Sequence, residues 1–383
     1  MDTDNKDSPI IRRILKESGM PDVALFLSRL STNDFCSLLM HIYGKRVEKQ
    51  TSESVIAAFN KKYAYVGTSG LDQRETTRLE NLLYEIVPKE FDAIELSPVC
   101  PLGTNGALTM ISQNNVLSAI RDMEVAADVT IALSMEAARR RAGFMKYDPK
   151  NSKEVNICTS ERLLRLQPFE PESGFSQHFR CFGMATAASS VPFRNFTIQA
   201  ATKHLTVYLK LIEELNAGYY DFQDITVYFS DIRIIDRLAE TISLDKEEIR
   251  RNTQNPDFRL FEKYGISLPA ITDNVDTLDQ QAVVRYKLER NISFLSEFQN
   301  MAFPAMKTMF PWVNFKIDLA RVAGIGYYSD FCLHIYARNR EGKTFPLADG
   351  GSVDWTRKLL RRNKELLFTS GFGSELAQRM FLL

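Results

Sequence analysis

The stretch SKEVNICTSERLLRLQPFEPESGFSQHFRCFGMATAA, residues 152–188, contains two strand-like segments and a loop. Its two ends are strand-like runs, and the loop between them is rich in Pro, Glu, Ser and Gly. Such runs, joined by a loop of this composition, are typical of paired antiparallel strands. The stretch therefore predicts a long antiparallel hairpin.

Amphipathic helices and short strands are predicted on both sides of this hairpin. Apolar side chains recur at helical spacing in residues 74–87 and 197–216. Residues 91–98 (FDAIELSP) alternate as a strand that ends at Pro98. The other predicted segments are a strand-to-helix transition at 130–144 (TIALSMEAARRRAGF), a strand at 224–231, a mostly helical region from 234 to about 310, strands at 312–320 and 326–337, a helix at 354–368, and the closing GFGSELAQRM at 371–380.

The first 65 residues predict a small helical module. Polar residues 31–34 offer N-caps to a first helix that extends to Val47, and residues 52–63 predict a second helix. Apolar side chains recur at helical spacing in the first helix, at Phe35, Leu38, Leu39, Ile42 and Tyr43. Because such a stripe is usually packed inside a protein, we expect it to form a core and assign it no binding role.

Composition narrows the class of protein. The chain has 383 residues, enough for two or three domains, and 48 basic residues balance 48 acidic ones, which excludes a generally basic nucleic-acid coat. No apolar run approaches the roughly 20 residues of a membrane span, and the polar start MDTDNKDSP is unlike a secretory signal. The five cysteines are scattered and form no CxxC pair, so a cytosolic protein without disulfides or structural zinc is expected.

Common catalytic motifs fail on inspection. EGKT at 341–344 lacks the first glycine of a phosphate loop, since Ala337 stands there, and Ser176 lacks the second glycine of a nucleophile elbow. The four histidines, His41, His178, His204 and His334, show no metal-binding spacing. These patterns argue against a hydrolase triad and a metalloenzyme, and no metal site is predicted.

The order of the segments resembles the core of class II aminoacyl-tRNA synthetases. Within that class the chain is most similar to histidyl-tRNA synthetase and its paralogue, the ATP phosphoribosyltransferase regulatory subunit, over residues 70–383. The resemblance implies an α+β fold in which helices flank an antiparallel β-sheet. The expected domains are an N-terminal helical module at 1–66, the first part of the core at 67–200, a helical insertion at 201–312, and the second part of the core at 313–383.

Two segments before the hairpin carry part of this resemblance. FDAIELSP is similar to motif 1, which builds the dimer interface in the family, so a homodimer through the Pro98 segment is implied. LSMEAARRR at 133–141 resembles the family's LRPEGTA stretch, so Glu136 matches the glutamate that holds the substrate amino group. A carboxylate suits that role through charge-assisted hydrogen bonds. The alternative for Glu136 is an exposed glutamate that the helix dipole favours.

The hairpin resembles motif 2, the F-R-x-E hairpin, with Gln167 in place of the glutamate. Arg165 matches the arginine that contacts the ATP α-phosphate, where a planar guanidinium binds two oxygens as negative charge develops. His178 and Arg180 lie on the returning strand, where the family places nucleotide contacts. ATP with magnesium is thus an implied cofactor. The alternative for Arg165 is a solvated arginine on a strand.

The last segments resemble the histidyl branch. AGIGYYSDFCLHIYA at 323–337 is similar to RGLDYYTGTVFEVY, so Tyr327 and Tyr328 match its tyrosine pair as substrate contacts. DGGSVDW at 349–355 resembles GGGRYDGL, and Asp354 matches its aspartate.

GFGSELAQRM resembles motif 3, whose arginine grips the γ-phosphate. That position falls on Gln378, with Arg379 one residue later. One residue rotates a helical side chain by about 100°, so Arg379 points away unless the helix register slips.

Departures from the family fall on the residues that read histidine. Cys181 and Ala185 stand where the family has a glutamine and a glutamate. Ala323 and Gly326 replace an arginine and an aspartate, and Ser352 and Val353 replace an arginine and a tyrosine. Such a pocket cannot recognise an imidazole in the family's way, and the lost arginine costs transition-state stabilisation. Arg321 replaces that arginine only if its strand shifts register. Because only FLL follows the motif 3 segment, no anticodon-binding domain is expected.

Three functions remain open. The first is a non-catalytic regulatory or ligand-sensing dimer, with a protein partner and a small-molecule ligand. The second is an ATP-dependent ligase that forms an adenylate on another carboxylate, in a pocket that Ala185, Ala323 and Val353 make more apolar than a histidine site. The third is RNA binding through the basic runs at 139–141 and 357–364, although charge runs on helices are usually solvated.

Overall fold

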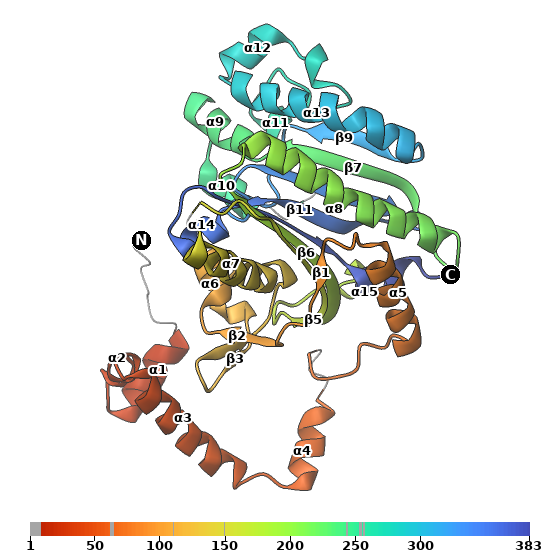
Figure 1. Cartoon of the computed structure of the whole chain (residues 1–383). Coiled ribbons are helices and arrows are strands. Elements are labelled where there is room, and N and C mark those ends of the chain that lie inside the picture. The colour runs from red at the N-terminus through yellow and green to blue at the C-terminus, as the bar shows by residue number, and fades with distance from the viewer. Residues whose placement is uncertain are drawn as a thin grey trace.

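A nine-stranded sheet forms the centre of the protein in the computed structural model, which describes residues 9–61, 65–109, 111–148, 150–242, 244–252, 255 and 257–383 (Figure 1). Neighbouring strands are antiparallel except for the first and the last-but-one pairs. In sheet order the strands are β1 (Asp92–Ala93), β5 (Val155–Leu164), β6 (His178–Ser189), β12 (Glu365–Phe372), β11 (Thr344–Val353), β10 (Phe331–Arg338), β7 (Gln223–Asp231), β9 (Asn314–Asp318) and β8 (Ile271–Thr272). The predicted α+β fold with a mostly antiparallel sheet is confirmed.

The predicted hairpin is confirmed as β5 and β6. Its register runs from Val155 opposite Ala187 to Leu164 opposite His178. Gly174 in the connecting loop adopts a positive φ of 75°, and a Cβ there would lie 2.8 Å from side-chain atoms of Leu376 and Met380. Glycine at this position therefore lets the loop approach the C-terminal helix closely.

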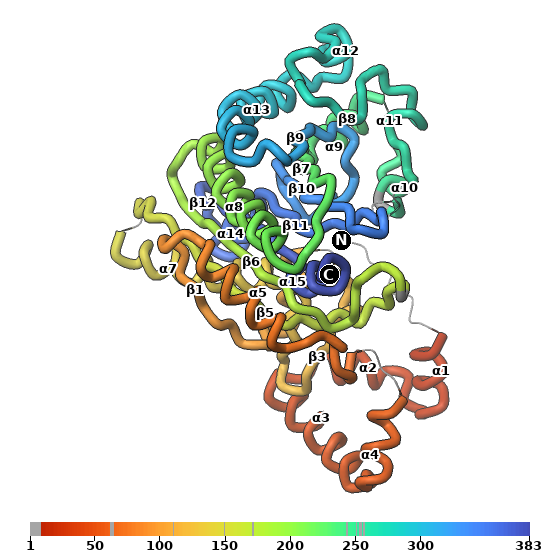
Figure 2. The backbone as a smooth tube through the Cα atoms, turned by 90° about the vertical axis from the view of Figure 1, so that its right-hand side faces the viewer, coloured from red at the N-terminus to blue at the C-terminus, as the bar shows by residue number. Residues whose placement is uncertain are grey.

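Helices cover both faces of the sheet. One face carries α5 (Gln73–Ile86), α8 (Phe193–Asn216), α13 (Glu289–Met309) and α15 (Ser374–Phe381), and the other carries α7 (Val129–Tyr147) and α14 (Trp355–Leu360) (Figure 2). A large apolar core lies beneath the first group and a smaller one beneath α7. Because side chains alternate along a strand, each strand of the hairpin contributes to both cores.

Two sequence predictions near the hairpin are wrong. Residues 130–144 contain no strand, because α7 begins at Val129 with Asp128 as its side-chain cap, and burial against β5 and β6 outweighs the β-branched residues at its start. The strand predicted at 91–98 is only β1, and Pro98 does not end it. Pro98 instead precedes β2 (Val99–Pro101), which forms a small antiparallel sheet with β4 (Met123–Val125) and β3 (Ser118–Ala119). The short helix α6 (Thr104–Leu108) follows β2.

Residues 233–309 are mostly helical, as predicted. They form α9 (Arg233–Ile242), α10 (Lys246–Arg251), α11 (Leu260–Lys263), α12 (Gln280–Arg285) and α13, with β8 between α11 and α12. Their apolar side chains join the larger core. The boundary predicted at residue 201 assigns most of α8, and all of β7, to the insertion, whereas α8 packs on the sheet and β7 lies within it. The division into domains otherwise stays a prediction.

The described residues of the N-terminal module form four helices: α1 (Pro9–Ser18), α2 (Val23–Ser28), α3 (Thr32–Val47) and α4 (Ser52–Phe59). Both predicted helices are present, although residues 62 and 63 lie outside the described part of the chain. None of the residues in these helices is buried, and Figures 1 and 2 show them standing apart from the sheet. The expectation that the stripe along α3 forms a core is therefore wrong in the isolated chain.

Candidate functional site

The alternation of the hairpin divides the predicted site residues between two faces of the sheet. Arg165, Cys181 and Ala185 lie on the face that α7 covers. His178 and Arg180 lie on the opposite face, beside α5 and α15. The predicted site residues on the hairpin therefore belong to two polar clusters, one on each face of the sheet.

The α7-face cluster is built around Asp128, which caps α7 by accepting a hydrogen bond from the Thr130 backbone N–H at 2.9 Å. Arg165 Nη2 lies 3.1 Å from Asp128 Oδ2, and Arg165 Nε donates to the Ala127 carbonyl at 2.7 Å. The Tyr327 hydroxyl donates to the same carboxylate oxygen at 3.1 Å. Burial, and then the charge of Asp128, raises the pKa of Tyr327 well above its usual value. The guanidinium of Arg165 therefore already holds an internal carboxylate.

Arg321 lies beside the tyrosine pair without any shift of strand register. It follows β9 in a loop, where its Nε donates to the Ala323 carbonyl at 2.9 Å and its guanidinium lies 5.7 Å from the centre of the Tyr328 ring. Arg321 is 7% exposed, and its Nη1 has no hydrogen-bond partner among the described residues. Burial raises the pKa of Asp349, and the positive charge of Arg321 offsets part of this rise. This buried guanidinium keeps one donor uncommitted.

Glu161 is a feature of this face that sequence reasoning missed. It lies on β5, two strand positions before Leu163, and is 7% exposed. Neither carboxylate oxygen has a hydrogen-bond partner among the described residues. Burial, reinforced by the charge of Asp128, raises the pKa of Glu161 to about 7. A carboxyl group in this setting is held largely neutral below that pH.

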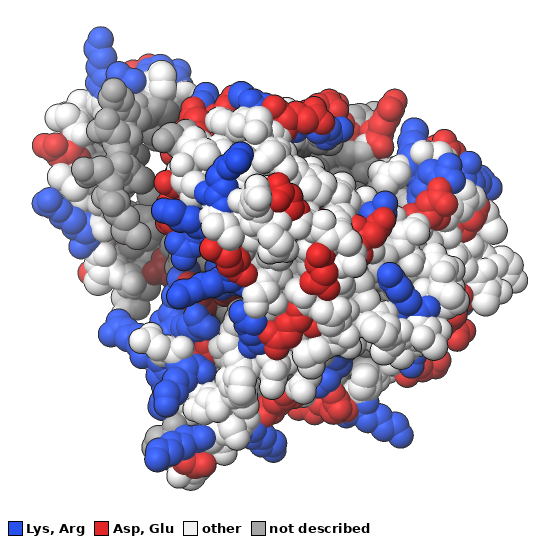
Figure 3. Space-filling view, turned by 90° about the horizontal axis from the view of Figure 1, so that it is seen from above, with Lys and Arg blue, Asp and Glu red and all other residues white. Residues whose placement is uncertain are grey.

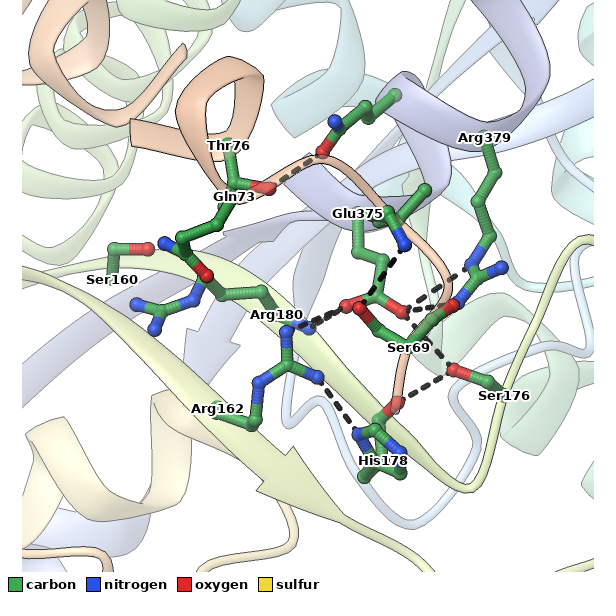
Figure 4. Close-up of polar contacts among 12 residues, drawn as sticks. Ser69, Gln73, Thr76, Ser160, Arg162, Ser176, His178, Arg180, Glu375 and Arg379 are labelled. Carbon is green, nitrogen blue, oxygen red and sulfur yellow. Dashed lines mark hydrogen bonds and ion pairs between the residues drawn. The ribbon is translucent and has the colours of Figure 1, made fainter. Parts of the chain in front are cut away.

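The opposite cluster is built around Glu375, which lies in the first turn of α15 and is 3% exposed (Figure 4). Arg379 Nη2 lies 2.7 Å and Arg162 Nη2 lies 3.2 Å from its carboxylate oxygens. The Ser176 hydroxyl and the Arg180 backbone N–H also donate to this carboxylate, at 3.2 and 3.1 Å. Glu375 thus occupies the centre of the positive groups that the hairpin brings to this face.

The remaining groups of this cluster also have partners, except that the buried Nε of Arg180 has no hydrogen-bond partner among the described residues. His178 Nδ1 lies 2.8 Å from Arg162 Nη1, and Arg180 Nη1 donates to Glu80 of α5 at 2.8 Å. Arg379 Nη2 donates to the Ser69 carbonyl at 2.5 Å. Gln378 is buried and accepts a hydrogen bond from Thr76 of α5 at 2.8 Å. Gln378, which stands at the position of the motif 3 arginine, therefore faces α5, whereas Arg379 lies beside the hairpin.

Two predicted substrate contacts have other partners. Glu136 lies two helical turns after the start of α7, where it pairs with Arg139 at 2.6 Å and with Arg140 at 2.8 Å. Arg140 also reaches Asp92 of β1, so the structure does not bring Glu136 to Arg165. Asp354 precedes α14 and pairs with Lys358 at 2.9 Å on the surface.

The two positions on β6 that replace histidine-reading residues are closed. The Cys181 thiol donates to the Phe372 carbonyl at 3.2 Å, and burial raises the pKa of this thiol. Ala185 is fully buried and lies opposite Ile157 and Thr369 in the sheet. Neither side chain offers a charge or a free donor to a ligand.

ATP with magnesium does not fit the residues as they are arranged. Arg165, Arg162 and Arg379 each hold an internal carboxylate, with which the phosphates of a nucleotide would have to compete. No group of three or more potential metal-binding side chains occurs within the described residues.

No helix within the described residues is long and apolar enough to cross a bilayer.

Comparison with solved structures places this fold among known ones. An ATP phosphoribosyltransferase regulatory subunit/histidyl-tRNA synthetase from Bacillus halodurans matches with a TM-score of 0.58 and 13% identity, covering 82% of this chain and 81% of that one. A histidine–tRNA ligase subunit from Alicyclobacillus acidocaldarius matches with a TM-score of 0.59 and 12% identity, covering 82% of this chain and 95% of that one. The histidyl-tRNA synthetase of a Nostoc species matches with a TM-score of 0.51 and 14% identity, covering 82% of this chain and 73% of that one.

No family model matches the chain, and no curated protein matches it either. Identities of 12–14% reveal a shared fold and nothing finer. The chain has the class II synthetase-like core fold of histidyl-tRNA synthetases and the ATP phosphoribosyltransferase regulatory subunit.

Proposed function

We propose that the protein is a non-catalytic, regulatory or ligand-sensing relative of histidyl-tRNA synthetase. The observation that carries this proposal is the internal pairing of its arginines. Arg165 holds Asp128 and a backbone carbonyl, while Arg162 and Arg379 share Glu375. Transition-state stabilisation needs preorganised donors that are free to meet developing charge, and these donors are engaged.

The substrate side supports the same proposal. Ala185 is buried, Cys181 is half-buried with its thiol bonded to the Phe372 carbonyl, and Glu136 pairs with arginines on its own helix. A site that recognises a polar side chain needs buried polar groups aimed at it. The cluster at Asp128, Arg165 and Tyr327 is instead satisfied from within.

The proposal predicts that the purified protein supports no exchange of pyrophosphate into ATP with any standard amino acid. Such exchange reports formation of an aminoacyl adenylate, and Arg165 and Arg379 would first have to leave their internal carboxylates to contact the phosphates of ATP. The measurement is incorporation of labelled pyrophosphate, with an active histidyl-tRNA synthetase as the positive control. Exchange above background with any one amino acid would count against the proposal.

One observation favours the alternative of an adenylate-forming ligase. The uncommitted Nη1 of Arg321 is buried near Asp349, on the same face as Arg165. An unpaired buried donor is costly, and an anionic ligand would relieve that cost. A ligase would show exchange with a carboxylic acid outside the standard amino acids, and Arg321→Gln would abolish that exchange.

A homodimer through the Pro98 segment remains part of the proposal. The small sheet next to Pro98 exposes apolar side chains in a group: Val99, Leu102, Leu117 and Met123, each 38–46% exposed. Grouped apolar side chains of this kind mark interaction surfaces more often than isolated ones do. Light scattering is expected to give twice the chain mass, and Leu102→Asp with Met123→Asp is expected to give the single mass. A wild-type monomer at micromolar concentration would contradict this part.

The other predicted partners have less support. Of the basic run at 139–141, Arg139 and Arg140 pair with Glu136, and Arg141 is buried against Glu365. RNA binding through this run is therefore disfavoured. A protein partner, a small-molecule ligand and a cytosolic location stay predictions.

A further inference from the structure

We infer that the cavity where α8, α9 and α13 meet is a binding site for a small phosphate-bearing molecule. This cavity has a volume of about 440 Å³ and lies away from both clusters described above. Volumes of a few hundred cubic ångströms are typical of small-molecule sites. The inference does not depend on the proposed function, because it concerns a different part of the molecule.

Four arginines from three helices line this cavity. Arg194 comes from α8, Arg233 and Arg237 come from α9, and Arg290 comes from α13. Two acidic residues, Asp236 and Glu240, line it as well, and Glu297, Asp231 and Asp330 pair with Arg194 and Arg233. The positive charge that stays without a partner among the described residues is that of Arg290. Figure 3, which looks down on this helical end of the molecule, shows Lys and Arg side chains gathered along one flank with acidic side chains between them.

The arginines differ in how strongly they are held. Arg233 lies 2.7 Å from both Asp231, which is buried, and Asp330, so its guanidinium is fixed in place. Arg194 pairs with Glu297, and Arg237 pairs with Glu240, on the surface. Surface ion pairs of this kind contribute little and exchange readily for a stronger anion.

Arg290 is the most available of the four. No ion pair or hydrogen bond involves its side chain within the described residues, and it is exposed. A free guanidinium next to three others is a setting in which a doubly charged phosphate can accept several charge-assisted hydrogen bonds at once.

The starts of two long helices reinforce the positive potential. Figure 1 shows α8 and α13 side by side and running in the same direction, and their first-turn residues Arg194 and Arg290 line the cavity. Neither helix has a side-chain cap at its N-terminus. Their dipoles add to the charge of the arginines, and first-turn amides are available as donors, although Glu289 offsets part of this effect at α13.

An apolar wall distinguishes this cavity from a plain anion site. Phe193 and Phe294 line it, with ring centres 6.0 Å apart, and the guanidinium of Arg194 lies 5.5 Å from the Phe294 ring. A phosphate monoester places its organic part against such a wall and its phosphate against the arginines. Inorganic phosphate gains only the second contact, so the ester is expected to bind more tightly.

Calorimetry on the full chain tests this inference with three probes: inorganic phosphate, pyrophosphate and glucose 6-phosphate. The wild type is expected to bind glucose 6-phosphate more tightly than inorganic phosphate. Arg290→Gln and Arg237→Gln are each expected to weaken that binding about tenfold, the loss of one charge-assisted hydrogen bond. Lys210→Gln, which removes an exposed cation further along α8, is the matched control and is expected to change nothing.

Four outcomes would overturn the inference, and the first three concern the phosphate probes. They are the absence of binding by all three probes, equal affinity in Arg290→Gln and the wild type, and loss of binding in Arg165→Ala, which would move the phosphate site to the α7 face. A short single-stranded RNA that binds while glucose 6-phosphate does not would also overturn it in favour of a nucleic-acid surface. Equal melting temperatures of the variants are expected, because Arg290 and Arg237 lie on the surface and Arg290 stabilises no partner.

Discussion

Glu365→Ala is expected to lower the free energy of unfolding by about 3–5 kcal/mol, the typical cost of removing one partner from a buried ion pair. Glu365 and Arg141 are both fully buried, and two hydrogen bonds of 2.9 and 3.1 Å join them. The pair links α7 to β12. Without the carboxylate, a buried guanidinium would keep only its two contacts to the carbonyls of Lys153 and Asn151.

Urea denaturation followed by circular dichroism measures this effect. Asp354→Ala is the control, because its pair with Lys358 is exposed and is expected to contribute less than about 1 kcal/mol. If Glu365→Ala lowered the free energy of unfolding by less than about 1 kcal/mol, water or a rearrangement of the protein would have replaced the carboxylate as partner of the Arg141 guanidinium. The account of how α7 is anchored to the sheet would then be wrong.

Glu161→Gln is expected to stabilise the protein at about pH 8, by up to roughly 3 kcal/mol. The pKa of Glu161 is raised to about 7 in the folded state, so the folded state holds this proton more tightly than the unfolded state does. Raising the pH from about 4.5 to 7 therefore removes stability, and the loss is complete above pH 7. Glutamine keeps the shape of the side chain but carries no titrating proton.

The measurement is the difference in unfolding free energy between Glu161→Gln and the wild type as a function of pH. Taking the difference cancels the other titrating groups, apart from Asp128, whose charge also acts on Glu161. The difference is expected to grow as the pH rises through this window. A difference that does not vary with pH would mean that Glu161 is ionised in the folded protein and finds a partner there.

Local patterns were sufficient to predict the hairpin and most helices. The loop between β5 and β6 has turn residues at its centre, and the long apolar stripe of α8 has the helical period. The start of α7 was misjudged, because its β-branched residues Val129, Thr130 and Ile131 favour a strand when read alone. Asp128, two residues before Thr130, was the available signal, since Asp commonly caps helices.

The observed start of α7 also bears on Glu136, which the resemblance matches to the glutamate that holds the substrate amino group. The carboxylate at the start of α7 is Asp128. A helix rises 1.5 Å per residue, so eight residues separate the two positions by about 12 Å. The role of Glu136 as a substrate contact stays a prediction.

Glu161 and Glu375 were missed for a different reason. Each lies within a quoted motif, yet its role depends on contacts from distant segments, such as Asp128 for Glu161 and Arg162 for Glu375. The spacing of Glu375 and Arg379 by four residues on a helix was a visible hint of their pairing. The alternation of Thr159, Glu161 and Leu163 on the buried face of β5 was a second one.

The measurement that tests the central claim most directly is the exchange of labelled pyrophosphate into ATP, run with each standard amino acid in turn and with magnesium. The account predicts background rates for the wild type, for Arg165→Ala and for Glu375→Ala alike, because no adenylate forms. A rate above background that depends on one amino acid and disappears in Arg165→Ala would contradict the account. It would show that Arg165 leaves Asp128 to serve catalysis.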